Sequence, residues 1–308
     1  MNVILHPTDF SDCAHAAFEH AVRVAAHRKA ELHLLHAVVL HGERTVDPFA
    51  HFPSADEVAQ RVRDAALSEL SDLGSRAAAA DARIEVKEVS RRGFYPAQVI
   101  LEYTEEVRAD LIVMGTHSRS PWKHFLLGSV TEAVMGRSPT PVLAVRQGKE
   151  ETREARPPGT IVVATDFSSS SRRALETAVE WARAEEAPLD LVHVVEPPVW
   201  VDAYTPGGLE GALFETEELK EKALELLEEE LERLELEGAE PETRRHVLEG
   251  HPPEEIVAHA RHSDARLIVT ATRGRTSWEH LLLGSTAERI VRFADCPVLV
   301  TPGPGSGD

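Results

Sequence analysis

An internal repeat constrains the fold of this chain more than any other feature, because most segments of the first half return in similar form about 157 residues later. The repeated segments are TDFS at 8–11 and 165–168, LLHAV at 34–38 with LVHVV at 191–195, and PVLAV at 141–145 with PVLVT at 297–301. A chain of 308 residues that repeats itself in this way is expected to fold as two similar domains.

Each copy alternates segments typical of strands and of helices. In the first copy we expect strands at 3–7, 32–40, 84–89, 111–114 and 142–145, and helices at 12–28, 55–78, 96–108 and after Ser129. This alternation favours an open, Rossmann-like α/β sheet of five parallel strands in each domain, with helices on both faces. We place the domains at 1–146 and 159–308, joined by a charged linker at 147–158 that ends in Pro-Pro-Gly.

The second copy is expected to follow the same order of elements. Its middle helix, predicted at 215–237, is strongly acidic, and we interpret the acidic run as a solvated face. Its leucines are predicted to lie on one side of the helix, at positions 219, 224, 227, 231 and 234.

Residues 111–134 (LIVMGTHSRSPWKHFLLGSVTEAV) return as 267–290 (LIVTATRGRTSWEHLLLGSTAERI). In each copy a short apolar strand is followed by a loop and then by Gly-Ser at the start of a helix. Ser129 and Glu132 have the spacing of a capping box, which makes Ser129 the predicted N-cap. A loop that enters a helix N-terminus offers backbone N–H groups and the positive end of the helix dipole, so it predicts a phosphate site.

Other residues of interest follow the ends of strands that should be neighbours. Because ligands of open parallel sheets bind beyond the carboxyl ends of the strands, these residues are expected to converge on one crevice in each domain. They are Asp9, Val38 and Gly115 in the first copy, and Asp166, Val195 and Ala271 in the second.

The glycine spacing after the fourth strand, together with an aspartate after the first, resembles the universal stress protein family over about residues 1–146 and 159–302. The resemblance implies ATP binding, with Mg²⁺, in a tandem member. It implies that Asp9 and Asp166 lie near the ribose or the metal, and that the backbone at Val38 and Val195 meets the adenine. The residues it implies around the phosphates are Gly115, Gly128, Ser129, Val130 and Thr131, and in the second copy Ala271, Gly274, Gly284, Ser285 and Thr286.

Each copy departs once from the family pattern. The second loop glycine is Ser118 in the first copy, and the first is Ala271 in the second. A left-handed conformation at Ser118 would cost about 1 kcal/mol, which weakens a site no more than about tenfold. We therefore expect both crevices to be usable; the alternative is that one has become purely structural.

Structural explanations compete with several of these assignments. Asp9 and Asp166 precede helix starts, so they serve either as capping residues alone or as ligands as well. The loop glycines are either simple turn residues or phosphate contacts. His36 and His193 lie within strands and are interpreted as core or rim residues. The basic loop residues either reach phosphates or face solvent; they are Arg119, Lys123, Arg273 and Arg275. Trp122 and Trp278 are interpreted as packing anchors or lid residues rather than as stacking platforms.

Charge and composition exclude several other classes of function. The net charge of −19 argues against binding to nucleic acid or to an anionic membrane surface. No apolar run approaches the ~18 residues of a membrane span. Cys13 and Cys296 form no disulfide framework, which fits a reducing cytoplasm, and the first ten residues do not resemble a signal peptide.

The function we expect is nucleotide binding rather than fast catalysis. The sequence has no Walker loop and no repeated catalytic triad, so ATP hydrolysis is expected to be slow at most. The alternative is a scaffold of the same fold, free of nucleotide, with vestigial loops. By analogy with the family, 142–145 would pair with 298–301 to form an intramolecular pseudo-dimer. The sequence leaves a homodimer and the protein partners open.

Overall fold

A computed structural model of the chain describes residues 2–39, 55–116, 127–147, 159–196, 208–234, 241–272 and 283–303. The chain divides into two compact units, residues 1–147 and 148–308, which we call domain 1 and domain 2. The predicted linker at 147–158 lies outside the described residues except for Gln147.

Domain 1 contains one open sheet whose strands lie in the order β3-β2-β1-β4-β5, with every neighbouring pair parallel. The strands are β1 Val3–Pro7, β2 Glu31–Val39, β3 Val86–Gly93, β4 Leu111–Gly115 and β5 Val142–Val145. The helices are α1 Asp12–Arg28, α2 Ala55–Ala80, α3 Pro96–Val107 and α4 Ser129–Arg137.

Domain 2 repeats this arrangement with the strand order β8-β7-β6-β9-β10, again parallel throughout. Its strands are β6 Ile161–Ala164, β7 Leu189–Val195, β8 Thr243–Glu249, β9 Leu267–Ala271 and β10 Val298–Thr301. Its helices are α5 Ser169–Ala184, α6 Gly208–Glu232, α7 Pro252–His262 and α8 Ser285–Phe293. The predicted fold class, five parallel strands in each of two Rossmann-like domains, is confirmed.

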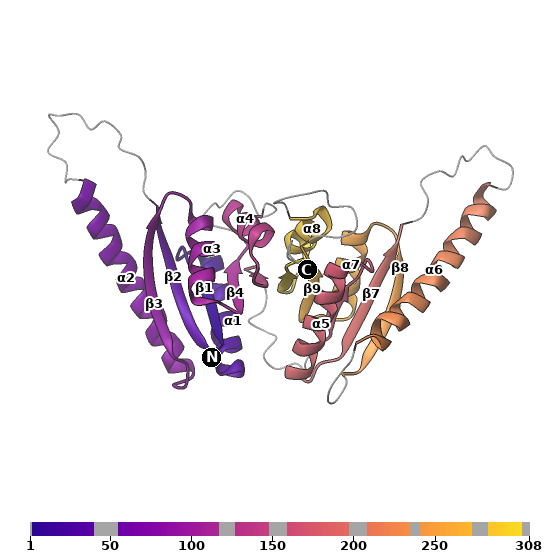
Figure 1. The fold of residues 1–308 in the computed structure, drawn as a ribbon, viewed down its shortest axis with the longest axis horizontal. Helices are drawn as coiled ribbons and strands as arrows, with labels where there is room; N and C mark the ends of the chain where they lie inside the picture. Colours follow the sequence, from indigo (N-terminus) through magenta and orange to yellow (C-terminus); the bar gives the residue numbers. More distant parts are fainter. Residues whose placement is uncertain are drawn as a thin grey trace. The chain divides into compact units, whose positions relative to one another are not determined.

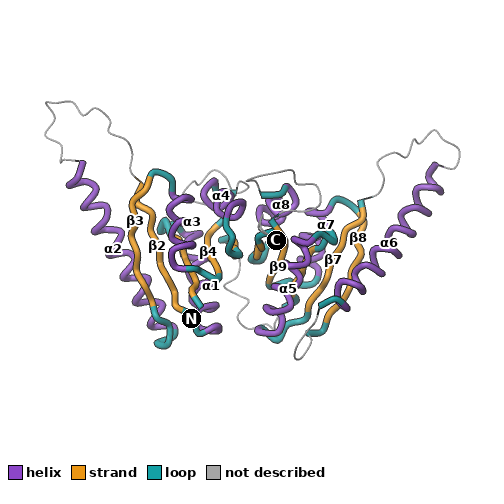
Figure 2. Tube along the Cα trace, in the orientation of Figure 1, coloured by secondary structure: helices purple, strands orange, loops and turns teal. Residues whose placement is uncertain are grey.

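In each domain the helices cover both faces of the sheet (Figures 1 and 2). In domain 1, α1 and α2 share one face, where Arg76 of α2 pairs with Glu19 of α1. The central strands are apolar along their whole length because they are covered on both sides: Ile4, Leu5, Ile112 and Val113 are at most 1% exposed. The described helices include none that is both long enough and apolar enough to cross a membrane.

Several predicted boundaries need correction. β3 begins at Val86 rather than Ile84 and continues to Gly93, because it pairs with β2 along that whole length. Gly115 closes β4 instead of following it, since it pairs with Val145 of β5. Helix α6 spans 208–232, not 215–237.

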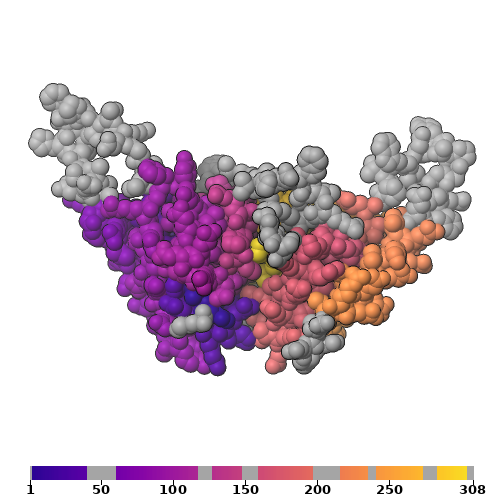
Figure 3. All heavy atoms as spheres, in the orientation of Figure 1, coloured from indigo at the N-terminus to yellow at the C-terminus, as the bar shows by residue number. Residues whose placement is uncertain are grey.

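The buried stripe of α6 also differs from the predicted one. Leu219 and Leu224 are 47% and 44% exposed, whereas Leu227 is buried as expected. The stripe instead includes Thr216, Ala223 and Glu230, all spaced for one helix face. Helix α6, orange in Figure 3, lies at the surface of its domain, and most of its described glutamates face solvent.

Glu230 is the exception to the solvated acidic face. It is 3% exposed, and Arg172 of α5 donates to it through Nη2 at 2.6 Å and Nε at 3.3 Å. The hydrogen bond to Glu230 raises the pKa of Arg172. A buried carboxylate needs such a partner, so this pair links α5 and α6 on one face of the sheet.

His6 in β1 is a buried polar residue that sequence patterns assign simply to a strand. Its Nδ1 is 2.8 Å from the carbonyl oxygen of Val113, and the ring lies 5.9 Å from that of Phe18. Burial lowers the pKa of His6 to about 4, although the bond to Val113 opposes the shift. The matching position of domain 2 holds Val163, since His6 pairs with Leu34 and Val163 with Leu191.

Gly115 ends β4 where α1 crosses it. A Cβ at this position would lie 2.8 Å from the carbonyl oxygen of Cys13 and 3.0 Å from its Sγ. The backbone of α1 therefore approaches β4 too closely for any side chain, and packing alone explains this glycine.

We predict that His6→Val makes domain 1 less sensitive to acid. The unfolded chain takes up a proton near pH 6.5, whereas folded His6 does so only near pH 4. Stability is therefore lost as the pH falls through this window, by up to about 3 kcal/mol. Hydrogen exchange of β1 and β4 peptides at pH 7 and pH 4.5, corrected for intrinsic rates, should show a smaller loss in the variant. An unchanged loss would mean that another group causes it.

We also predict that Gly115→Ala destabilises domain 1 by about 1–3 kcal/mol, because the new methyl group would overlap the backbone of Cys13. The matched change in domain 2, Ala271→Gly, should cost less than about 1 kcal/mol. Hydrogen exchange of each domain measures both. Equal effects of the two substitutions would show that the close approach at Gly115 is not what selects glycine there.

Candidate functional site

The strand order of each domain creates one switch point, and the predicted crevice would lie there. In domain 1, β2 lies on one side of β1 and β4 on the other, so the connections from β1 and β4 leave in opposite directions at their carboxyl ends. In domain 2 the same reversal lies between β6 and β9. Such switch points are where open α/β sheets bind ligands.

The TDFS segments form the same turn at both switch points. Thr8 Oγ1 accepts from the backbone N–H of Phe10 at 3.0 Å, and Asp9 Oδ1 accepts from that of Ser11 at 3.1 Å. The corresponding bonds of Thr165 and Asp166 have the same lengths. The aspartates are thus turn residues as well as candidate ligands. The helix N-caps that follow are Ser11 and Ser168.

The turn holds one residue in a strained conformation. Phe10 and Phe167 have φ values of 60° and 62°, in the left-handed region that costs a non-glycine residue about 1 kcal/mol or more. Strain of this kind persists where surrounding contacts fix the backbone, and it is common at functional sites. Both copies share this conformation, so it is a constant feature of the turn.

The histidines of the second strand provide those contacts. His36 Nδ1 lies 2.8 Å from the carbonyl oxygen of Thr8, and its ring stacks on Phe10 at 4.7 Å. His193 makes the same bond to Thr165 at 2.8 Å and lies 4.4 Å from the ring of Phe167. The interpretation of His36 and His193 as structural agrees with these bonds. Sequence analysis missed their link to the turn, although the constant spacing of 28 residues in both copies was a usable signal.

The far side of the crevice is the start of α4 or α8. The Gly128 N–H donates to the carbonyl of Thr116 at 2.7 Å, and Gly284 does the same to Thr272 at 2.8 Å. Thr116 and Thr272 are in turn bonded to the last strand, at Val145 and Thr301. Both ends of the loop between β4 and α4, and of the loop between β9 and α8, are therefore tied to the sheet by hydrogen bonds.

The predicted capping box is wrong in detail. Gly128 and Gly284 are the N-caps, with φ values of −66° and −63°, and Ser129 and Ser285 are the first helical residues. The N–H of Glu132 bonds to the Gly128 carbonyl, which moves the cap one residue earlier than the S-x-x-E pattern suggests. Ser129 and Ser285 are exposed, and Val130 and Thr286 are partly exposed beside them. Thr131 is buried and donates to the Gly115 carbonyl at 2.7 Å.

The other predicted contacts lie at strand ends. Val38 is the last residue but one of β2, paired with Arg92, and Val195 closes β7. The Val195 carbonyl accepts from the Gly250 N–H at 3.0 Å, so an adenine that used this oxygen would be its second donor. Ala271 closes β9 and is 8% exposed. Gly274 lies outside the described residues, as do Ser118 and the basic and aromatic residues predicted in the loops.

The arrangement suits an anion and a cation held side by side. The first N–H groups of α4 and α8 have no partner within the helix, and the helix dipole makes this end positive. The Asp9 and Asp166 carboxylates follow the neighbouring strand of the same switch point. A carboxylate near a phosphate site is a typical ligand of Mg²⁺, with the phosphate oxygens as the other ligands.

Comparison with known proteins identifies the family. The model of the universal stress protein family matches residues 1–146 and again 158–302. The universal stress protein MJ0531 of Methanocaldococcus jannaschii is 38% identical over 151 residues, which is 48% of this chain and 84% of that protein. YxiE, a universal stress protein of Bacillus subtilis, is 32% identical over 149 residues, 47% of this chain and 99% of its own length.

Solved structures give the same result for the fold. A universal stress protein from Archaeoglobus fulgidus aligns over 100% of this chain and 98% of its own, with a TM-score of 0.68 and 24% identity. A universal stress protein solved in complex with cAMP is 30% identical over 48% of this chain and 98% of its own, and its TM-score of 0.34 is too low to bear on the fold. With the family model matched twice, this chain belongs to the universal stress protein family and carries two copies of its domain in tandem.

Proposed function

We propose that this protein binds ATP, together with Mg²⁺, at the switch-point crevice of one or both domains. The nucleotide would act as a regulatory ligand that favours one conformation or one partner. Hydrolysis is proposed to be slow at most. The family membership supports a nucleotide function. Cys13 and Cys296 are buried and not joined in a disulfide, which supports a reducing cytoplasm as the location.

One observation carries the proposal, namely the backbone conformation of Gly128 and Gly284. Their φ values of −66° and −63° are ones that any residue adopts, so the turn itself does not require glycine. Gly115 differs, because the contact with Cys13 explains it. Glycine at the end of this loop in both domains is best explained by a ligand that approaches the backbone where a Cβ would stand.

The alternative function is a scaffold without nucleotide. It would account for the Asp9 and Asp166 carboxylates, since both already accept a backbone bond in the turn. Glycine is an acceptable N-cap, but Ser, Asp or Asn would cap each helix better, and a scaffold gives no reason for glycine at both helix starts in their place. ATP binding is therefore the better supported function.

We predict that calorimetric titration of the nucleotide-stripped protein with Mg²⁺ and ATP gives a stoichiometry near two. Gly128→Val and Gly284→Val should each remove one site without unfolding the chain, because valine fits the observed φ values. In each variant the untouched domain is the control. A stoichiometry of one in the parent protein would restrict the proposal to one domain, and no binding, with an unshifted melting temperature, would overturn it.

A second prediction tests the metal role of Asp166 separately from its role in the turn. Asp166→Asn keeps an oxygen that can accept from Ser168 but removes the charge. In a Gly128→Val background, which leaves one crevice, the affinity for Mg²⁺ and ATP should fall about tenfold, or about 1.4 kcal/mol. Affinity for ATP with the metal chelated should change little.

Equal losses with and without Mg²⁺ would contradict the metal role of Asp166. The same substitution at Asp9, in a Gly284→Val background, repeats the test in domain 1. If either asparagine variant unfolds its domain, the turn needs the carboxylate, and an amide cannot replace it.

A further inference from the structure

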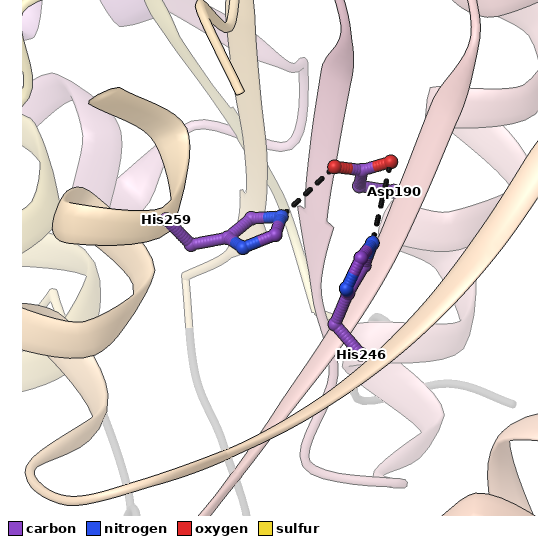
Figure 4. Close-up of side chains that lie close together, drawn as sticks. All are labelled: Asp190, His246 and His259. Carbon is purple, nitrogen blue, oxygen red and sulfur yellow. Dashed lines mark hydrogen bonds and ion pairs between the residues drawn. The ribbon is translucent and has the colours of Figure 1, made fainter. Parts of the chain in front are cut away.

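Asp190, His246 and His259 of domain 2 point toward one another from three different elements, β7, β8 and α7 (Figure 4). His259 Nε2 lies 2.8 Å from Asp190 Oδ2, and His246 Nε2 lies 3.5 Å from Asp190 Oδ1. One ligand atom from each residue lies within 4.8 Å of the other two. Two imidazoles thus share a single carboxylate.

This cluster is distinct from the crevice described above. Asp190 is the second residue of β7, five residues before Val195 at the carboxyl end. At about 3.3 Å per residue, the two positions are roughly 16 Å apart along the strand. The cluster also lies on β7 and β8, whereas the switch point lies between β6 and β9.

Hydrogen bonding within the described residues leaves the cluster incomplete. Asp190 is 1% exposed, yet its Oδ1 has no hydrogen bond to any described residue, and the buried Nε2 of His246 has none either. Arg244 Nη1 approaches Oδ1 only to 4.0 Å, because its guanidinium is held by Glu242 at 2.8 and 3.0 Å. Asp190 Oδ1 and His246 Nε2 face each other at 3.5 Å, which is too long for a good hydrogen bond. Buried polar atoms without a hydrogen bond are costly, and one bound cation would satisfy both at once.

We propose that Asp190, His246 and His259 form a binding site for a divalent transition metal ion of the Zn²⁺ class. Two imidazole nitrogens and a carboxylate oxygen are ligands that Zn²⁺ prefers, and Mg²⁺ does not take nitrogen ligands readily. Bonds of about 2.1 Å place tetrahedral ligand atoms about 3.4 Å apart. The separations of 2.8 and 3.5 Å run to different oxygens of Asp190, and one ligand atom from each residue lies within 4.8 Å of the others, so side-chain rotations would bring the three to this spacing.

The partial exposure of the two histidines gives an ion a route to the cluster, and a water molecule would be its fourth ligand. The His246 and His259 side chains are 31% and 14% exposed, while Asp190 lies beneath them at 2%. Binding would require each ligating Nε2 to be unprotonated, with the ring proton on Nδ1. His259 would then exchange its hydrogen bond to Asp190 for a shared metal.

Domain 1 shows that the fold does not need such a cluster. The position of Asp190 is occupied by His33, and that of His259 by Tyr103. His33 Nδ1 lies 2.9 Å from the Tyr103 hydroxyl, and its Nε2 lies 2.9 Å from Glu31. The position of His246 is occupied by Val89, as the pairing of Val89 with Leu35 and of His246 with Val192 shows. Only domain 2 therefore has this set of ligands at these positions.

The test is titration of the full, nucleotide-free chain with Zn²⁺, and with Co²⁺ as a spectroscopic probe. We expect one tight Zn²⁺ site per chain, the visible absorption of four-coordinate Co²⁺, and no competition by Mg²⁺. His259→Gln should weaken Zn²⁺ binding about 100-fold or more, since even partners that only support a ligand contribute 10–100-fold. Glutamine can still donate to Asp190, so the domain should stay folded.

His262→Gln is the matched control. It removes an exposed histidine from the same helix, outside the cluster, and should leave the affinity unchanged. His246→Gln gives a second, independent variant if His259→Gln proves unstable by circular dichroism. Binding of equal strength in the parent, His246→Gln and His259→Gln proteins, or no tight site in the parent, would overturn the proposal.

Discussion

The parallel pairing of β1 with β4, and of β6 with β9, is the constraint on which both domains depend. It joins strands that are far apart in sequence, and so it creates the switch point at which the chain leaves the sheet in two directions. The TDFS turn and the glycine-capped helix start are the two segments that follow these strands. Their closeness is a consequence of topology, and the local hydrogen bonds only fix their orientation.

The two copies differ where packing and chemistry differ, and they agree where the crevice is built. The turn bonds of Asp9 and Asp166 are the same length, and the strained phenylalanines differ by 2° in φ. By contrast, α1 approaches β4 so closely that position 115 requires glycine, whereas the equivalent position in domain 2 holds Ala271. Duplication has thus preserved the crevice more strictly than the helix packing behind it.

Much of the fold was predictable from sequence because parallel strands buried on both faces leave continuous apolar runs. The number of strands and their order along the chain follow from those runs, and the repeat supports each assignment with a second example. Boundaries were harder to predict where polar residues carry the pairing. β3 extends through Ser90, Arg91 and Arg92 because β2 is its partner over that length, which a search for apolar residues cannot detect. The cap of α4 was misplaced because a serine at a helix start resembles an N-cap whether it is the cap or the first helical residue.

The sites differed in how far sequence could predict them. The predicted crevice residues lie in repeated motifs, so comparison of the two copies and the family resemblance were enough to nominate them. Asp190, His246 and His259 are unique to one copy and widely spaced in sequence, and only the register of β7 with β8 and the position of α7 bring them together. A repeat draws attention to what both domains share, whereas a function acquired by one domain must lie in what they do not share. Within domain 2, β7 contributes to both places, with Asp190 near one end and Val195 at the other. An ion that joins β7, β8 and α7 would therefore stiffen the strand that ends at Val195, while the switch point itself would remain between β6 and β9.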